Sequence, residues 1–149
     1  MKLESEIKQE KFRSEYQKLA INILYTGGWL SLKNHGMLKP FNLTIQQYNI
    51  LRILKGQHPN PATVNLLIER MMDKMSNASR IVDRLEEKEL VVRKQKSDDR
   101  RCVDVMITAK GIKLLEKIKS TEEEFEENFK HLTLKEAKTL NDLLDKLRG

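Results

Sequence analysis

Two short amphipathic segments, separated by a few polar residues, constrain the fold of this chain more than any other feature. In residues 64–72, apolar side chains recur at the spacing i, i+3, i+4 and i+7, and residues 78–90 repeat that spacing. Such spacing places apolar side chains on one face of an α-helix. Because only residues 73–77 join the two helices, the sequence predicts a helix-turn-helix. The side chains predicted to be buried are Val64, Leu67, Ile68 and Met71 in the first helix, and Ala78, Ile81, Val82 and Leu85 in the second.

The periodicity changes after the second helix. Apolar residues alternate strictly from Val103 to Ile107, which is typical of a half-buried strand. We expect a β-hairpin with strands at about Val91–Lys96 and Cys102–Thr108, and with Ser97–Arg101 at its tip. A basic hairpin directly after a helix-turn-helix indicates a winged helix-turn-helix.

Helical patterns flank this region on both sides. A long helix is predicted from Phe12 to Leu30, where Gly27 and Gly28 are expected to bend or weaken it, followed by a loop over Asn34–Pro40. Capping signatures at Thr44 with Gln47, and at Thr133 with Glu136, mark the starts of two more helices.

The resulting fold class is mainly α with a small β-hairpin wing. We expect the 149 residues to form a single domain, 1–149. Within it, about 44–110 would form the winged helix-turn-helix DNA-binding lobe, and about 5–36 and 111–149 would form a helical dimerisation region.

The charge of the chain points to an acidic partner. Its net charge is +6 and 34% of its residues are charged, against about 25% in ordinary soluble proteins. A basic protein favours nucleic acid or an anionic membrane surface. No apolar run approaches the roughly 18 residues of a membrane span. The charged start lacks the apolar segment of a secretory signal, and the single cysteine fits a reducing compartment, so we expect no membrane association and a cytoplasmic protein.

The sequence lacks the usual patterns of an enzyme. The histidines, His35, His58 and His131, have no partner at metal-ligand spacing, and no glycine-rich phosphate loop is present. An acid/base role for Asp98 and Asp99 would require shifted pKa values, which an exposed hairpin tip does not provide. We therefore expect no catalysis, no metal and no cofactor.

The second helix carries the residues best suited to read DNA. Its side opposite the apolar face presents Ser76, Asn77, Ser79, Arg80 and Arg84. Arginine can bind guanine with two hydrogen bonds, asparagine can bind adenine in the same way, and serine can bond to either partner. The alternative is a solvated face, with Ser76 as the helix cap and Arg84 paired to Glu87 or Lys88.

The hairpin adds a second cluster of cations. Its candidate DNA contacts are Arg93, Lys94, Lys96, Arg100 and Arg101. Asp98 and Asp99 are interpreted as a brace that accepts hydrogen bonds from the turn or from a neighbouring arginine. The alternative is that all these charges are simply solvated.

Sulfur-containing residues have simpler interpretations. Cys102 beside two arginines could be a redox-sensitive thiolate, although a small strand residue facing the sheet is the commoner case. Met71, Met72 and Met75 are interpreted as adaptable core residues, with a pocket for an apolar effector as the alternative.

The terminal helices have larger apolar stripes than a small winged lobe needs to cover. Stripes of this size normally mark an interface, so we predict a homodimer. The alternative is that the two stripes pack on each other within one chain. The residues predicted to form the dimer interface are Phe12, Tyr16, Leu19, Leu140, Leu144 and Leu147.

Several of these segments together resemble the MarR family of bacterial transcriptional regulators. The matching pieces are SRIVDRLEEK in the second helix, DRR at the hairpin tip and ITAKG after it, within a match from about Thr44 to Leu115. The resemblance implies a homodimer in which each recognition helix enters a major groove of a palindromic operator and each wing reaches a minor groove. It also implies a repressor that releases DNA when a small apolar or phenolic effector binds.

Two positions depart from the family pattern. Glu89 stands where the family commonly has the glycine that ends the helix in a left-handed conformation. Since glutamate in that conformation would cost about 1 kcal/mol or more, we expect this helix to end differently. Met75 replaces a residue that is often polar or basic. The alternative to a DNA-binding regulator is a winged-helix module that binds a protein through the acidic segment Ser120–Asn128.

Overall fold

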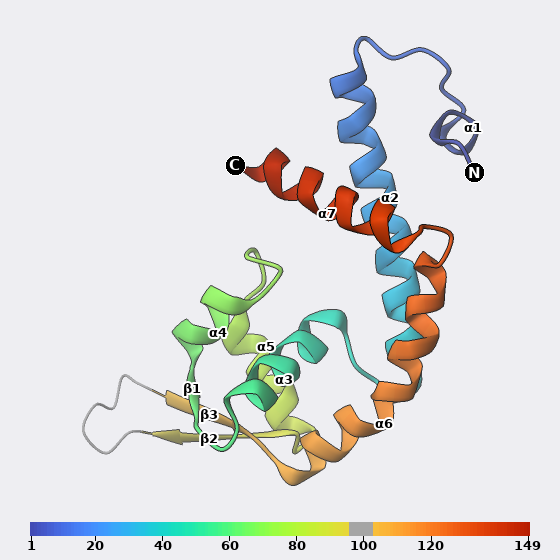
Figure 1. Cartoon of the computed structure of the whole chain (residues 1–149). Coiled ribbons are helices and arrows are strands. Elements are labelled where there is room, and N and C mark those ends of the chain that lie inside the picture. Colours follow the sequence, from blue (N-terminus) through green and yellow to red (C-terminus); the bar gives the residue numbers. More distant parts are fainter. Residues whose placement is uncertain (96–102) are drawn as a thin grey trace.

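The computed structural model of the chain describes residues 1–95 and 103–149 (Figure 1). The helices are α1 (Leu3–Ile7), α2 (Glu15–Leu38), α3 (Ile45–Gln57), α4 (Val64–Arg70), α5 (Ala78–Glu87), α6 (Ala109–Glu126) and α7 (Leu134–Arg148). The strands are β1 (Ala62–Thr63), β2 (Val91–Gln95) and β3 (Val103–Ile107), and short 3-10 turns cover Lys39–Phe41 and Glu127–Phe129.

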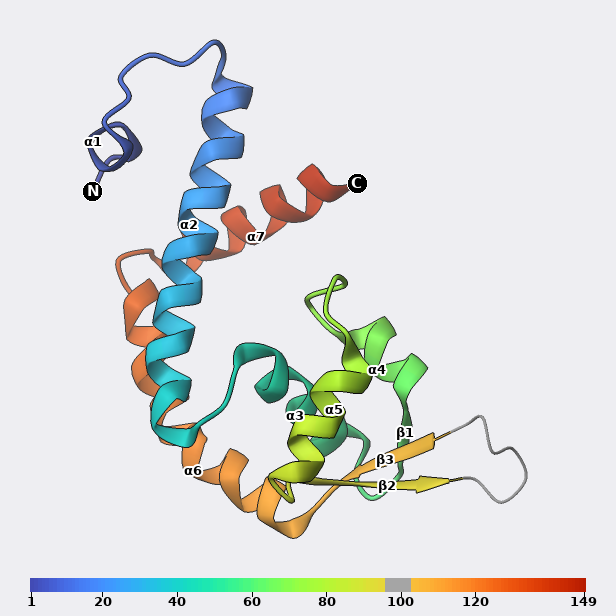
Figure 2. The same ribbon diagram turned by 180° about the vertical axis from the view of Figure 1, so that it is seen from behind.

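The elements form a compact lobe and a helical arm. Helices α3, α4 and α5 pack with the three strands in the lobe, while α2 and α6 run side by side in the arm (Figures 1 and 2). Helix α1 lies near the end of α2 that is farthest from the sheet, whereas α7 follows the end of α6 distant from the sheet and runs toward the side of the arm on which the lobe lies. The predicted fold class, mainly α with a small hairpin wing, is confirmed. Among the described residues, no helix combines the length and apolar character needed to cross a lipid bilayer.

The sheet contains a strand that the sequence did not indicate. Its strands are antiparallel in the order β1-β3-β2. In β1, Ala62 lies opposite Val105, while in β2 Val91 lies opposite Ile107. Because β1 has only two residues, it is too short to show an alternating pattern.

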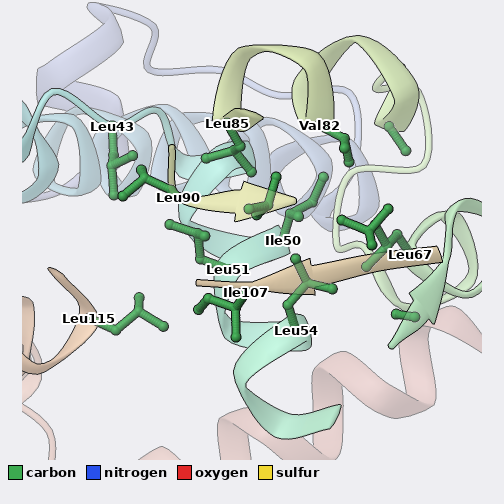
Figure 3. Packing of buried hydrophobic residues seen from close by; sticks show 14 of the residues in the cluster. Leu43, Ile50, Leu51, Leu54, Leu67, Val82, Leu85, Leu90, Ile107 and Leu115 are labelled. Carbon is green, nitrogen blue, oxygen red and sulfur yellow. The ribbon is translucent and has the colours of Figure 1, made fainter. Parts of the chain in front are cut away.

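The core of the lobe lies between α3, α5 and the sheet. Figure 3 shows side chains of α3 between those of α5 and β3. The prediction that Leu67, Met71, Ala78, Val82 and Leu85 are buried is confirmed. Other buried residues include Ile50, Leu51, Leu54, Val91, Val105 and Ile107.

The junction after α5 is a left-handed helix end, contrary to our expectation. Glu89 has φ = 60°, and its amide donates to the carbonyl of Glu86 at 2.8 Å. The amide of Leu90 donates to the carbonyl of Leu85 at 3.0 Å, and both leucines are buried. These two hydrogen bonds form a Schellman motif, in which the left-handed residue after the helix is usually glycine. The prediction that glutamate here changes the helix end is wrong, because the two hydrogen bonds and the buried contact outweigh the backbone strain.

The same junction explains the glycine in ITAKG. The amide of Thr108 donates to the carbonyl of Leu90 at 3.0 Å, which brings the start of α6 against the end of α5. A Cβ atom at Gly111 would lie 2.5 Å from that carbonyl oxygen and 2.7 Å from Cγ1 of Ile107. Only glycine therefore allows α6 to approach this closely.

The N-terminal half departs from the prediction in two ways. Helix α2 continues through Gly27 and Gly28 to Leu38, so the loop predicted over Asn34–Pro40 is wrong for most of its length. Phe12 precedes the helix, which Ser14 caps by accepting from the amide of Gln17. Glycine lowers helix stability without preventing a helix, which explains why the two glycines do not break α2.

Three residues predicted to be buried are exposed. In α4, the face that carries Leu67 packs against the core. Ile68 is 45% exposed because this short helix is covered on one side only. Met71 is buried, whereas Met72 and Met75 are exposed, so the interpretation of these methionines as core residues holds only for Met71.

Candidate nucleic-acid interface

Helix α5 presents one polar face outward from the lobe. Its opposite face, with Ala78, Val82 and Leu85, is buried in the core. Asn77 caps the helix, because its Oδ1 accepts from the amide of Arg80 at 3.1 Å. The alternative in which Ser76 is the cap is therefore wrong. Part of the hydrogen-bonding capacity of Asn77 is used inside the protein.

Ser76 belongs instead to the turn that precedes α5. Its hydroxyl donates to Oδ2 of Asp73 at 2.6 Å, and the amide of Met75 donates to Oδ1 of Asp73 at 3.0 Å. The hydrogen bond from Ser76, followed by that from Met75, lowers the pKa of Asp73 below its usual range. The turn therefore stays ordered around an ionised carboxylate, and the hydroxyl oxygen of Ser76 can still accept a hydrogen bond.

A shallow groove of about 280 Å3 lies between the first turns of α3 and α5. Its walls contain the predicted residues Ser76, Asn77, Arg80 and Arg84. The structure thus gathers these predicted residues at one place. Ser79 does not line the groove, although its side of α5 is exposed.

The α3 wall of the groove was not predicted. It consists of Thr44, Gln46 and Gln47, at the start of α3. The capping pair of Thr44 and Gln47 is observed as predicted, but the sequence marks it only as a helix start. The packing of α3 against α5 adds a second helix N-terminus to the groove, and helix N-termini favour anions through their free amides and dipole.

The two arginines of the groove differ in their partners. Nη1 of Arg84 lies 2.9 Å from Oε2 of Glu87, one turn along α5, in the surface pairing considered as an alternative. Within residues 1–95 and 103–149, the guanidinium of Arg80 has neither a hydrogen bond nor an ion pair. Arg80 is therefore the cation of α5 best placed to bind an external anion or base.

Arg93 on β2 is held against α5. Its Nη2 lies 2.6 Å from Oδ1 of Asp83 and donates to the carbonyl of Ser79 at 2.9 Å. Its amide donates to Oε1 of Glu86 at 3.1 Å. The side chain is only 26% exposed. These contacts fix the wing strand to the helix, so they favour a positioning role for Arg93 over the predicted direct contact with DNA.

The remaining wing predictions lie mostly outside the described residues. Lys94 is exposed on β2, opposite Asp104 in the strand register. The candidate contacts Lys96, Arg100 and Arg101, the proposed braces Asp98 and Asp99, and Cys102 fall in the part of the chain that is not described.

A third cluster joins the lobe to the arm. Nη1 of Arg52 on α3 lies 2.7 Å from Oε1 of Glu122 on α6 and donates to the hydroxyl of Tyr48 at 3.0 Å. The Tyr48 hydroxyl also donates to Glu122. Burial, and then the bond to Glu122, raise the pKa of Tyr48. This cluster borders a groove of about 420 Å3 between α3 and α6, which Lys55 and Lys119 also line.

The apolar residues of the arm are mostly uncovered in the single chain. Tyr16 is 85% exposed and Leu147 is 55% exposed. Leu19 and Leu140 are also exposed, while Phe12 and Leu144 are half-buried. The alternative in which the two stripes cover each other within one chain is therefore wrong. Leu24, within the stripe predicted from Phe12 to Leu30, is also exposed, and further exposed apolar residues that were not predicted are Leu32, Leu134 and Leu143.

In the part of the chain that is described, no three histidine, cysteine, aspartate or glutamate side chains gather as metal ligands would. The ionisable residues that line the α5 groove are Arg80 and Arg84, and its other polar lining residues carry hydroxyl and amide groups. This combination of cations and hydrogen-bonding groups suits the binding of an anionic, extended partner.

Comparison with known proteins points in the same direction. The model of the MarR family matches residues 43–103. The HTH-type transcriptional repressor IacR of Pseudomonas putida is 28% identical over 110 residues, which are 73% of this chain and 65% of the relative. The match thus spans slightly less than two thirds of that relative's length.

Solved structures extend the likeness beyond the lobe. The crystal structure of a MarR transcription factor from Planctomyces limnophilus has a TM-score of 0.70 at 29% identity and covers 91% of this chain and 98% of its own. The complex of MepR from S. aureus with DNA has a TM-score of 0.77 at 23% identity, with 92% and 97% of the two chains covered. At 23% identity, the likeness to the MepR complex shows a shared fold alone.

Proposed function

Because this chain belongs to the MarR family, we propose that it is a transcriptional regulator, in the manner of a repressor, that binds a specific sequence of double-stranded DNA. The α5 groove carries this proposal: two helix N-termini meet there beside Arg80, which has no partner among the described residues. The relative from Pseudomonas putida is a repressor, and MepR has been crystallised with DNA. Both are consistent with the proposed role.

In this proposal, α5 enters the major groove of DNA. Asn77, Ser79 and Arg80 at its N-terminal end lie nearest the base edges, and the first turn of α3 faces a phosphate. Ser76 and Arg84 contribute at the edges of the same surface. Arg93 holds the wing strand to α5, and the wing contacts proposed for the neighbouring minor groove are Lys94, Lys96, Arg100 and Arg101.

We further propose that two copies bind together. The exposed apolar side chains of α2 and α7 need a partner surface, and a second copy provides the same surface. A twofold-symmetric dimer would place its two α5 helices about one turn of DNA apart, roughly 34–36 Å, and would therefore bind a palindrome.

A small apolar or phenolic effector forms the last part of the proposal. The groove between α3 and α6 lies where the lobe meets the arm, and its lining combines cations with the Glu122 carboxylate, which accepts a hydrogen bond from the Tyr48 hydroxyl. A structurally similar regulator at 21% identity has been crystallised with 2,4-dichlorophenol. If a phenol binds at this junction, it should weaken DNA binding of the wild type and leave Arg52→Ala less affected.

Selection of bound duplexes from a random pool tests the proposed function. Purified protein should enrich a palindrome, and binding to it should weaken steeply as salt rises, because bound cations of the protein replace counterions on DNA. Arg100→Ala combined with Arg101→Ala should reduce that salt dependence. Failure to enrich any motif would refute specific recognition, and binding to a protein in place of duplex DNA would favour an interaction module. In such a module, the acidic segment Ser120–Asn128 would bind the protein partner without Glu122, because Glu122 is paired with Arg52 of the same chain.

A further inference from the structure

The turn between α4 and α5 directs methionine side chains away from the protein. Met75 is 95% exposed and Met72 is 72% exposed, whereas Met71 in the same turn is buried. An apolar side chain that is exposed beside a binding surface gains free energy when an apolar group of the partner covers it. Their position calls for an apolar group on the bound partner.

The backbone that carries these side chains is tied down by the protein. The amide of Met72 donates to Oδ1 of Asn49 on α3 at 3.0 Å. Nζ of Lys74 donates to the carbonyl of Ile68 at 3.3 Å, at the end of α4. The Asp73 carboxylate accepts hydrogen bonds from the amide of Met75 and the hydroxyl of Ser76, as described above. These hydrogen bonds hold the backbone of the turn, and the thioether side chains of Met72 and Met75 point outward from it.

The chemistry of DNA identifies one apolar group that Met75 could meet. We propose that Met75 contacts the 5-methyl group of a thymine in each half of the bound duplex, which makes it a determinant of sequence specificity. This inference rests on the proposed function. Met75 directly precedes Ser76 and Asn77, which line the α5 groove, so it continues the same surface.

Thymine is the base whose major-groove edge carries a methyl group, and apolar side chains contact it there. An uncharged thioether gains nothing from a phosphate, and its unbranched chain adapts to the position of the methyl. Met72 lies three residues further from α5 and has no groove-lining neighbour, so it provides a matched control of the same type in the same turn.

The experiment uses the enriched duplex and replaces each thymine in turn by deoxyuridine, which removes only the 5-methyl group. Affinities are measured by fluorescence anisotropy for the wild type, Met75→Ala and Met72→Ala. We expect one thymine in each half-site at which deoxyuridine weakens wild-type binding about fourfold, the factor for one buried methyl group. Met75→Ala should bind the thymine duplex more weakly and should no longer distinguish thymine from deoxyuridine there. Met72→Ala should keep the wild-type ratio.

Each other outcome overturns the inference in a recognisable way. If no single deoxyuridine weakens wild-type binding, or if Met75→Ala keeps the full ratio, Met75 does not read a thymine methyl although DNA binding stands. Loss of the ratio in Met72→Ala alone would assign the contact to Met72. If the wild type binds no duplex, the proposed function fails together with the inference. Because Met75 is exposed, circular dichroism should show that its variant is folded.

Discussion

Replacing Gly111 by alanine tests the packing that joins the wing to the arm. The new methyl group would lie 2.5 Å from the Leu90 carbonyl oxygen, whereas ordinary contact begins at about 3.4 Å. The obstacle is backbone that also accepts the amide of Thr108, so a simple side-chain rotation cannot relieve it. The end of α5 and the start of α6 would have to separate.

Two opposing terms determine the size of the effect. Alanine stabilises a helix interior by about 1 kcal/mol relative to glycine. Overpacking of a tight contact costs typically about 1–3 kcal/mol, and a backbone obstacle places this site in the upper part of that range. We therefore expect Gly111→Ala to lower the free energy of unfolding by about 1–2 kcal/mol. For a chain of this length, that corresponds to a decrease in Tm of about 3–6 °C.

Gly36→Ala in α2 is the matched control, because a Cβ at that position meets nothing within 4 Å. It should gain about 0.5–1 kcal/mol from helix propensity alone. Both variants are compared with the wild type by urea and thermal unfolding at one protein concentration, since the proposed dimerisation would make Tm depend on concentration. A gain in stability for Gly111→Ala like that of Gly36→Ala would refute the reasoning.

Three further predictions concern the lobe. Glu89→Gly should raise the free energy of unfolding by about 1 kcal/mol, because glycine adopts the left-handed conformation without strain; urea unfolding measures this, and a loss of stability would contradict it. Ser76→Ala should raise the pKa of Asp73 toward its ordinary value in an NMR titration, because the largest cause of the lowered value is removed. Since folding lowers the pKa of Asp73, its carboxylate stabilises the folded state above the unfolded pKa, and this stabilisation is lost as pH falls through the folded pKa. An unchanged pKa of Asp73 in Ser76→Ala would argue against the hydrogen bond from Ser76. A double-mutant cycle of Asp83→Ala and Arg93→Ala should give a coupling of up to about 1 kcal/mol, and strict additivity would show that the pair does not hold the wing.

Local sequence signals were sufficient to predict the helices and hairpin strands of the lobe, with α3 identified by its capping signature. Stripes that repeat every three to four residues identified α4 and α5, and alternation from Val103 identified β3. Where the patterns were weak, prediction failed for physical reasons. Strand β1 is too short to show a pattern. The two glycines of α2 suggested a weakened helix in the sequence, but the helical backbone continues through them.

The candidate site shows a different limit. Sequence identified the polar face of α5, because the helix wheel depends only on local geometry. It did not show that Asn77 would be used as a cap, that Arg93 would turn toward Asp83, or that the start of α3 would form the second wall. The orientation of Arg93 and the α3 wall depend on contacts between different elements, whereas the Asn77 cap is a local hydrogen bond to the amide of Arg80. Glu89 was misjudged because two hydrogen bonds at the helix end, together with the burial of Leu85 and Leu90, outweigh the strain of its left-handed conformation.

The most direct test of the account is the affinity of Arg80→Ala for the selected duplex. Arg80 lies in the α5 groove with no partner among the described residues, so its removal should weaken binding about tenfold or more, as expected for loss of a base contact worth about 1–3 kcal/mol. Lys138→Ala, which removes an exposed charge on α7 outside the lobe, should bind like the wild type at the same salt concentration. Equal affinity of Arg80→Ala and the wild type, or equal weakening by Lys138→Ala, would contradict the claim that this face of α5 binds DNA.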